Sequence, residues 1–575
     1  RPTSAVARPT SAVARPTSAA ARPTSVAARP AAARRADPAR PQAAKHDGAH
    51  ARVAINHAGD LRPAREAVGR REEPLTAEEE TAKQIEKLLR GPLRYGVTGL
   101  FVADARTGEA LFAVNADDPL NPASNVKMIS TATALELLGP DFRYPTRLLG
   151  ATPDGGAVRG DVYLLGSYDP TLTTADLDNI ASAVAARGIT QIDGAIVVGP
   201  DPTRDGIFRS VIPIEIRAGN EPGAAVTATA PAGMDLISLR IAAKTSKPGS
   251  RTRLTFKVEP ASDGAGHSRV VVNVGGTIAR GRETMYPLVT RERTAVAAYA
   301  LRTALRAHGV TVGGDFKVAE LDNFVGESVA AGNLPIELGR HESPRLAQII
   351  ARVNKWSINW LADRVIMTAA ALVKRQPPSM DLALSAMYDW LVRHPRIAKG
   401  DLLVDTGSGL SYHTRISAHE LVSILRSAAG FEPDGDSALS QAWLSSLSVA
   451  GTDGTLSSRF RAGELRGHVR GKTGTLSNAI ALSGILDFDP QRPLAFSLVT
   501  NGDAPLSKGY VRRAHEQVVG LLCRYLARTR KPDAAGPPPP PVPQELPAEP
   551  PPIPSTDLED LEPDSALDDE AAGQR

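Results

Sequence analysis

The sequence predicts an α+β fold that is interrupted by a mainly-β insertion. Helix-forming segments alternate with hairpin patterns on both sides of the interval 146–336. Within that interval the pattern changes to short β-type runs separated by Gly, Asp and Pro turns. With 575 residues, the chain is long enough for two or three domains.

The first predicted elements are a helix and a hairpin. Thr76-Ala-Glu-Glu79 is a capping-box pattern, and the helix that it opens runs to Arg90. Residues 97–103 and 109–114 are β-type runs joined by a turn, which predicts a hairpin. A second helix is predicted over 128–138.

After the insertion, helical patterning resumes at Ser343 and continues in an amphipathic run over 360–366. Residues 479–487 and 494–500 predict a second hairpin. A last helix is predicted over 508–528. Its apolar residues lie on one face: Val511, Val518, Leu522 and Tyr525. The only cysteine, Cys523, lies in the same apolar stretch and is predicted to be a buried structural thiol.

The two ends of the chain have opposite charge. Residues 1–71 contain 14 Lys and Arg against 4 Asp and Glu, and residues 533–575 contain 11 acidic residues against one Arg. The N-terminal seven-residue repeat carries a proline in every copy, so residues 1–75 are predicted to be a disordered basic arm. Residues 532–575 are predicted to be a disordered Pro-rich acidic tail. An alternative for the arm is electrostatic tethering to an anionic envelope polymer. Because the tails cancel, the net charge of +4 does not indicate nucleic acid, and we expect no such partner.

Three short motifs occur once each and in a fixed order. They are Ser124-Asn-Val-Lys127, Ser357-Ile-Asn359 and Lys472-Thr-Gly474. Each alone is a weak signal, but the ordered set is the signature of active-site serine penicillin-binding proteins and β-lactamases. The residues of the three motifs are therefore the candidate catalytic and binding groups.

The first motif supplies a nucleophile and a base. A serine hydroxyl needs a base within hydrogen-bond reach, and residues three apart on a helix share a face, so Ser124 and Lys127 are predicted to be neighbours. To accept a proton, Lys127 needs a pKa lowered from about 10.4 to about 7–8 by burial or by cations such as Lys472. Without the other motifs, a helix N-cap serine beside a solvated lysine is an equal interpretation.

The second motif places Ser357 and Asn359 two residues apart. An irregular turn or a loop leading into a helix is needed if both side chains are to reach the same pocket. The Ser357 hydroxyl can then relay a proton to a leaving amine, and the Asn359 amide can donate to a substrate carbonyl. The alternative is an ordinary capped start of the amphipathic helix.

The third motif is predicted to lie on an edge strand. Lys472 and Thr473 can hold a carboxylate there, and Gly474 allows close approach of the backbone. The N–H groups of Ser124 and Thr475 would form an oxyanion hole. A phosphate-binding loop ending at residue 473 is excluded, because position 466 is Arg where that motif needs Gly.

Beyond the motifs, the chain resembles the class C low-molecular-mass penicillin-binding proteins, the D-alanyl-D-alanine carboxypeptidase/endopeptidase family of the DacB type (peptidase family S13). The separation of 233 residues between Ser124 and Ser357 is similar to that family, in which a large insertion fills this interval, and differs from simple β-lactamases. Four further segments are similar to the family: Gly166–Leu172, His341–Pro344, Asp405–Leu410 and Ala450–Leu456.

The resemblance implies a β-lactamase/transpeptidase-like catalytic domain, an antiparallel sheet flanked by helices, formed by residues 76–145 and 337–531. Residues 146–336 would form one or more inserted domains. The implied activity is that of a serine carboxypeptidase or endopeptidase acting on peptidoglycan stem peptides through an acyl-enzyme on Ser124. Hydrolysis by water would follow with no metal or organic cofactor, β-lactams would be covalent inhibitors, and the location would be periplasmic or otherwise extracytoplasmic.

Two features depart from the family pattern. Ile358 stands where the family usually has Asp or Asn, and its side chain is predicted to point away from the site. Residues 205–250 lack the Trp- and Tyr-rich stretch of many members. A non-catalytic peptidoglycan-binding scaffold of the same fold, and a β-lactamase or esterase, remain alternatives, and the preference between carboxypeptidase and endopeptidase activity stays open.

Overall fold

The computed structural model describes residues 75–198, 211–230, 237–262, 268–289, 293–318, 335–432, 437–460 and 463–530. The predicted basic arm lies outside these residues except for Leu75, and the predicted acidic tail lies outside them entirely. Disorder of these segments, and the proposed tether, therefore stay predictions.

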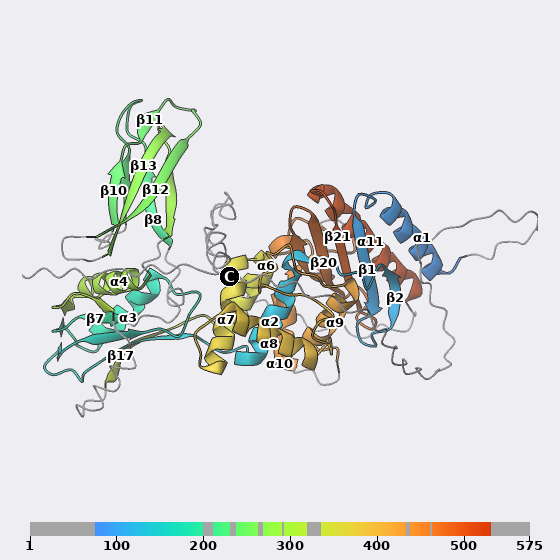
Figure 1. Ribbon diagram of the computed structural model, residues 1–575, viewed down its shortest axis with the longest axis horizontal. Coiled ribbons are helices and arrows are strands. Elements are labelled where there is room, and N and C mark those ends of the chain that lie inside the picture. Colours follow the sequence, from blue (N-terminus) through green and yellow to red (C-terminus); the bar gives the residue numbers. More distant parts are fainter. Residues whose placement is uncertain are drawn as a thin grey trace, which may run out of the picture. The chain divides into compact units, whose positions relative to one another are not determined.

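A six-stranded antiparallel sheet organises the part of the chain that carries the motifs (Figure 1). Its strand order is β18 (Ser448–Val449), β19 (Val469–Thr475), β20 (Ala479–Leu486), β21 (Leu494–Asn501), β1 (Val97–Asp104) and β2 (Ala110–Val114). Both predicted hairpins are confirmed: β1 pairs with β2, and β20 pairs with β21. Pairing of β1 with β21 joins the two hairpins, so segments from both ends of the chain share one sheet.

Helices cover both faces of this sheet. On one face, α1 (Ala77–Arg90) and α11 (Lys508–Thr529) bury alternate strand residues such as Leu100, Leu482 and Phe496. On the other face, α9 (Ala418–Ala428) packs on the intervening residues, including Phe101 and Ile485. The predicted apolar face of α11 is confirmed as buried, and so is the thiol of Cys523.

A second group of helices packs around α2 (Lys127–Leu138), which is almost entirely buried. These helices are α6 (Leu346–Trp356), α7 (Asn359–Lys374), α8 (Met380–Arg393) and α10 (Ser437–Ser446). Buried polar side chains fix α2 among them. Asn354 of α6 donates to Thr131 of α2 and to Ser446 of α10, at 3.1 and 2.8 Å. The indole N–H of Trp443 donates to the Met128 carbonyl at 3.2 Å.

The strands that the structure describes in the insertion form four sheets. A five-stranded sheet has the order β16 (Lys317–Val318), β7 (Ile196–Val198), β5 (Val162–Leu165), β3 (Pro145–Gly150) and β17 (Ile336–Glu342), and a three-stranded sheet has the order β15 (Thr311–Val312), β6 (Gln191–Ile192) and β4 (Ala157–Val158). The remaining strands are β8 (Val211–Arg217), β9 (Thr227–Thr229), β10 (Ile237–Ile241), β11 (Lys244–Ser246), β12 (Arg253–Ser262), β13 (Ser268–Ala279) and β14 (Glu283–Val289).

In its described residues, the insertion also contains helices α3 (Thr174–Ala186) and α4 (Arg293–Ala307), which the sequence analysis did not identify. β5 and β7 are parallel, and a parallel pair needs a crossover connection, which α3 helps to supply. The pattern Thr173-x-x-Asp176 forms the capping box of α3 and was a signal that could have revealed it.

The chain enters and leaves the insertion at neighbouring positions in the structure. β3 pairs with β17 in antiparallel register, with Pro145 opposite Glu342. Just beyond this pair, the Tyr144 N–H donates to the Ser343 hydroxyl at 2.9 Å. The pairing of β17 with β3 continues to Glu342, and the domain boundary at 336 stays a prediction. The helix predicted from Ser343 begins at Leu346.

No helix in the described ranges combines the length and apolar character needed to cross a membrane.

Candidate active site

The candidate nucleophile lies in a short 3₁₀ helix, η1 (Ala123–Val126), that leads directly into α2. Ala123 has a φ of 49°, a left-handed conformation that is uncommon outside glycine and is often found at functional sites. Asn121 holds this turn in place, because its Oδ1 accepts from the Ala123 N–H at 2.8 Å and its own N–H donates to Asn501 of β21 at 2.7 Å. The start of α2 is thus fixed to the sheet.

The structure brings Ser124 and Lys127 together as the sequence predicts. The Lys127 Nζ lies 3.0 Å from the Ser124 Oγ. Two further oxygens surround this nitrogen, the Asn359 Oδ1 and the Ser408 carbonyl, each at 2.6 Å. Lys127 is fully buried, so the nitrogen is held by protein groups.

The second motif lies at the junction of two helices. Ser357 ends α6 in a left-handed conformation with a φ of 56°, and Asn359 is the first residue of α7. This is the irregular turn into a helix that the spacing required. Ile358 packs against the apolar cluster around α2 and α7, as predicted for a side chain that points away from the site.

Lys472 is in direct contact with Ser357. Its Nζ donates to the Ser357 Oγ at 2.8 Å and to the Thr473 carbonyl at 2.9 Å, and the side chain is fully buried. Burial, and secondly the charge of Lys127, hold the pKa of Lys472 well below its usual range. The sequence expectation that Lys472, with Thr473, holds a substrate carboxylate stays a prediction.

The third motif lies on β19, next to a very short edge strand. β18 pairs only with Arg470 and Gly471, so the backbone from residue 472 onward has no strand beyond it in the described part of the chain. The Leu476 N–H bonds to Ala479 of β20, and alternate residues of an antiparallel strand point to opposite neighbours. The N–H of Thr475 therefore points towards the open edge, away from β20.

Gly474 brings β19 close to the nucleophile. A Cβ at this position would lie 2.4 Å from the Pro122 carbonyl oxygen and 3.2 Å from the Ala123 Cβ. No side chain fits there without moving η1, so the sequence expectation of a close backbone approach is met. The hydroxyl of Thr473 donates to Thr455 of η2 (Gly454–Leu456) at 2.9 Å, and the hydroxyl of Thr475 accepts from Arg512 at 2.9 Å.

Sequence reasoning missed an acidic residue close to Lys127. Asp363 lies one turn after Asn359 on α7 and packs against Gly407, and its Oδ1 is buried with no hydrogen-bond partner among the described residues. Burial raises the pKa of Asp363 to about 6, although hydrogen bonding with Ser408 and the charge of Lys127 act in the opposite direction. The family-like segment Asp405–Leu410 contains Gly407 and Ser408, which contact Asp363. No spacing rule connects that segment to α7.

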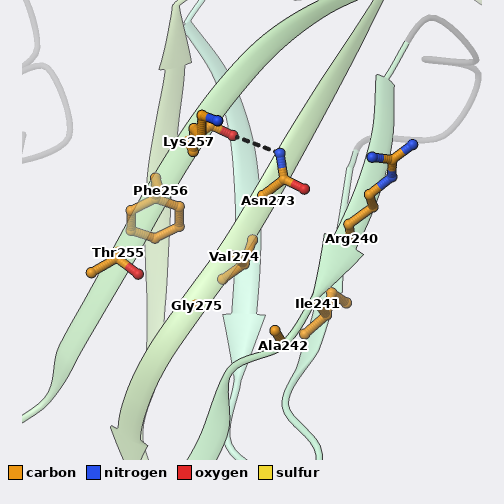
Figure 2. A pocket seen from close by; sticks show the side chains of 9 residues that line it. All are labelled: Arg240, Ile241, Ala242, Thr255, Phe256, Lys257, Asn273, Val274 and Gly275. Carbon is orange, nitrogen blue, oxygen red and sulfur yellow. Dashed lines mark hydrogen bonds between the residues drawn. The ribbon is translucent and has the colours of Figure 1, made fainter.

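A separate pocket of about 320 Å³ lies on the insertion and is lined by residues of β10, β12 and β13 together with Ala242 (Figure 2). Its lining includes Arg240, Phe256 and Lys257, and the Asn273 amide donates to the Lys257 carbonyl at 3.3 Å. The lining has no carboxylate, histidine or cysteine. Among the residues that the structure describes, no cluster of His, Cys, Asp or Glu is suited to hold a metal ion.

The structure thus contains a serine bonded to a buried lysine, a second serine bonded to a second buried lysine, and an open strand edge that carries the third motif. This arrangement is the one expected of an active-site serine enzyme. Comparison with known proteins specifies the class further. Residues 81–205 and 199–525 match the D-Ala-D-Ala carboxypeptidase 3 (S13) family, which covers most of the chain. The chain therefore belongs to this family, and the resemblance identified from the motifs is confirmed.

Individual relatives agree with this assignment. A D-alanyl-D-alanine carboxypeptidase of Actinomadura sp. is 28% identical over 480 residues, covering 74% of this chain and 82% of the relative. The D-alanyl-D-alanine carboxypeptidase DacB of Haemophilus influenzae is 23% identical over 408 residues, covering 66% and 80%. The solved penicillin-binding protein 4 (DacB) of the same organism aligns with a TM-score of 0.59 at 20% identity, covering 76% of this chain and 99% of that one, and it supports the fold.

Proposed function

We propose that this protein is a serine-type D-Ala-D-Ala carboxypeptidase, with endopeptidase activity on cross-bridges of similar stereochemistry, that acts on peptidoglycan stem peptides through an acyl-enzyme on Ser124. The observation that carries the proposal is the 3.0 Å distance between the Ser124 Oγ and the Nζ of the fully buried Lys127. This is within the hydrogen-bond reach that a general base needs.

Lys127 acts as the base in this proposal. A neutral amine has two N–H groups and one lone pair, and the two oxygens at 2.6 Å, from Asn359 and Ser408, match the two N–H groups. The lone pair is then directed at the Ser124 hydroxyl. Lys127 takes that proton while the Ser124 Oγ bonds to the carbonyl carbon of the penultimate D-Ala.

Ser357 and Lys472 act on the leaving group. The tetrahedral intermediate collapses by breaking its C–N bond, and the leaving amine must take a proton. The Ser357 hydroxyl, which accepts from the Lys472 Nζ at 2.8 Å, is suited to relay it. Lys472 thus acts on the leaving group indirectly, by donating a hydrogen bond to the Ser357 hydroxyl. The amide oxygen of Asn359 accepts a hydrogen bond from the Lys127 Nζ. The amide nitrogen of Asn359 therefore remains available to donate to a substrate carbonyl.

The oxyanion that forms at the carbonyl needs donors placed before the reaction. The N–H of Thr475 at the open edge of β19 and the N–H of Ser124 are proposed for this role, and Gly474 permits their approach. The proton that Lys127 took from Ser124 passes through Ser357 to the leaving amine, so Lys127 is neutral again. A water molecule then attacks the acyl carbon, one of its protons passes through Lys127 to the Ser124 Oγ as the ester C–O bond breaks, and the shortened peptide is released. These proposed steps use side chains and backbone N–H groups of the protein together with one water molecule.

The substrate sets the expected partners and location. Peptidoglycan stem peptides lie outside the cytoplasmic membrane, so we propose an extracytoplasmic location. β-Lactams are proposed as covalent ligands of Ser124, and the solved Haemophilus relative is a complex with a β-lactam. Tethering through the basic N-terminal arm remains a prediction from sequence.

The test is the intact mass of the protein after incubation with benzylpenicillin, with wild type beside Ser124→Ala. We expect one equivalent of adduct on wild type and none on the variant. Absence of an adduct on folded wild type, with benzylpenicillin left intact, would favour the non-catalytic scaffold. Absence of an adduct with rapid loss of benzylpenicillin would favour a β-lactamase.

A further inference from the structure

The four-stranded sheet of the insertion has one apolar face and one polar face. Its central strand β13 has β12 on one side and β10, followed by β11, on the other. On one face, residues such as Leu239, Leu254 and Val272 pack into the core of the insertion. Because side chains alternate along a strand, the residues between them lie on the opposite face, and most of these are exposed or partly exposed.

Two pairs of cations lie on the exposed face. Arg240 of β10 and Lys257 of β12 are both opposite Asn273 of β13, one on each side (Figure 2). Four residues further along β13, Lys244 of β11 and Arg253 of β12 flank the central strand in the same way. All four cations are exposed, and the rise of a strand places the two pairs about 13 Å apart. We call these four residues the basic face.

Most of the charge of the basic face is unpaired. Lys257 forms an ion pair with Glu259 at 2.6 Å, and the charge of Arg240 also acts on Glu259. Arg240, Lys244 and Arg253 form no ion pair within the described part of the chain. Like charges on one face of a sheet repel each other, and an anion placed between them relieves that repulsion. Two of the cations are arginines, whose planar guanidinium matches a carboxylate. The basic face is therefore suited to an anionic ligand.

A hollow lies between the two pairs of cations. The row of residues that separates the pairs contains Thr255 and Gly275, which are opposite each other and line the pocket of about 320 Å³ (Figure 2). A Cβ at Gly275 would lie 2.7 Å from the Thr255 Oγ1, so the glycine keeps this part of the sheet open. The lining between the charges is uncharged, which allows an uncharged part of a ligand to lie there while its carboxylates meet the cations on either side.

We propose that the basic face, with the hollow between its two pairs, is a second binding site for peptidoglycan that takes carboxylates of stem peptides other than the one being cleaved. This inference rests on the proposed function, because it adds a second contact with the same polymer. Stem peptides recur along that polymer, so one contact raises the effective concentration for the other. A short peptide substrate cannot gain from this effect.

The test measures binding to the polymer and cleavage of a short peptide separately. Wild type and the triple variant Arg240→Gln/Lys244→Gln/Arg253→Gln are sedimented with insoluble peptidoglycan, before and after hydrofluoric acid has removed its phosphodiester-linked polymers. Both proteins are also assayed for release of D-Ala from diacetyl-Lys-D-Ala-D-Ala. The matched control is a second triple variant that removes the same charge from exposed positions outside this sheet, Arg306→Gln/Lys374→Gln/Lys399→Gln.

We expect the Kd of the first triple variant for peptidoglycan to rise about tenfold, as for the loss of three exposed ion pairs, and the Kd of the control to stay at the wild-type value. Cleavage of the short peptide should be unchanged in both, which also shows that they are folded. Arg240→Lys/Arg253→Lys, which keeps the charge of the basic face, should bind peptidoglycan as wild type does.

Equal binding by the two triple variants would overturn the second site, and so would a loss of short-peptide cleavage in the first variant alone. Binding by wild type that disappears after the hydrofluoric acid treatment would also overturn it, because the partner would then be a phosphodiester polymer. Failure of wild type to cleave the short peptide or to form the benzylpenicillin adduct would instead overturn the proposed function.

Discussion

Gly474→Ala tests how closely the third motif must approach the nucleophile. The added Cβ would lie 2.4 Å from the Pro122 carbonyl oxygen, whereas ordinary contact begins at 3.4 Å. The clash is with backbone that leads directly to Ser124, so relieving it requires β19 and η1 to separate by about 1 Å, a displacement that costs roughly a hundredfold in rate in a preorganised site. The free energy of unfolding should also fall, by about 1–3 kcal/mol for overpacking.

The rate of benzylpenicillin adduct formation, followed by intact mass, measures the first effect, and a urea unfolding curve measures the second. Gly520→Ala is the control, because its Cβ would meet nothing closer than 3.6 Å in the middle of α11. That variant should acylate normally and gain up to about 1 kcal/mol of stability from helix propensity. Acylation of Gly474→Ala at the wild-type rate would refute the proposed approach of β19 to the nucleophile.

Three further predictions follow from buried groups. Lys127→Ala should slow acylation by about 10²–10⁴-fold at a preserved circular dichroism spectrum, and acylation near the wild-type rate would contradict its role as the base. The pKa of Asp363 is about 6 in the folded protein, against an ordinary value of 3.8. The unfolded chain therefore loses the proton at lower pH than the folded protein does. As a result, the free energy of unfolding decreases as pH rises between about 4 and 6. Asp363→Asn should therefore gain about 2–3 kcal/mol relative to wild type between pH 4 and 7 in urea unfolding, and parallel pH profiles would exclude this. Burial raises the pKa of Cys523 to about 11, so iodoacetamide at pH 8 should label it only in denaturant, and labelling of the native protein would show that the thiol is accessible.

The sequence was sufficient for features that depend on near neighbours in the chain. The capping box at Thr76, the two hairpins and the 3.0 Å contact between Ser124 and Lys127 all follow from local spacing. The turn at Ser357 was also predictable, since two side chains two residues apart can face one pocket only where the backbone is irregular.

Features that depend on packing were not predictable in this way. Arg512 and Arg513 are adjacent and chemically identical, and only the docking of α11 on the sheet determines which of them reaches Thr475. Asp363 acquires its raised pKa from burial, which arises where α7 packs against Gly407, and no sequence pattern links that residue to α7. The complete burial of Lys472 was not predictable for the same reason, because burial is a property of the whole fold.

The pairing of β3 with β17 has a consequence for how the chain assembles and varies. In the folded insertion the two ends lie side by side, with Pro145 opposite Glu342. The long segment between the first two motifs therefore behaves as a short closed loop. Doubling the length of a flexible loop adds only about 0.6 kcal/mol to its closure cost, and a folded insertion adds less. Residues can therefore be gained or lost beyond this strand pair with little thermodynamic effect on the meeting of α2 and α6. We expect folding of the insertion to precede and accelerate that meeting.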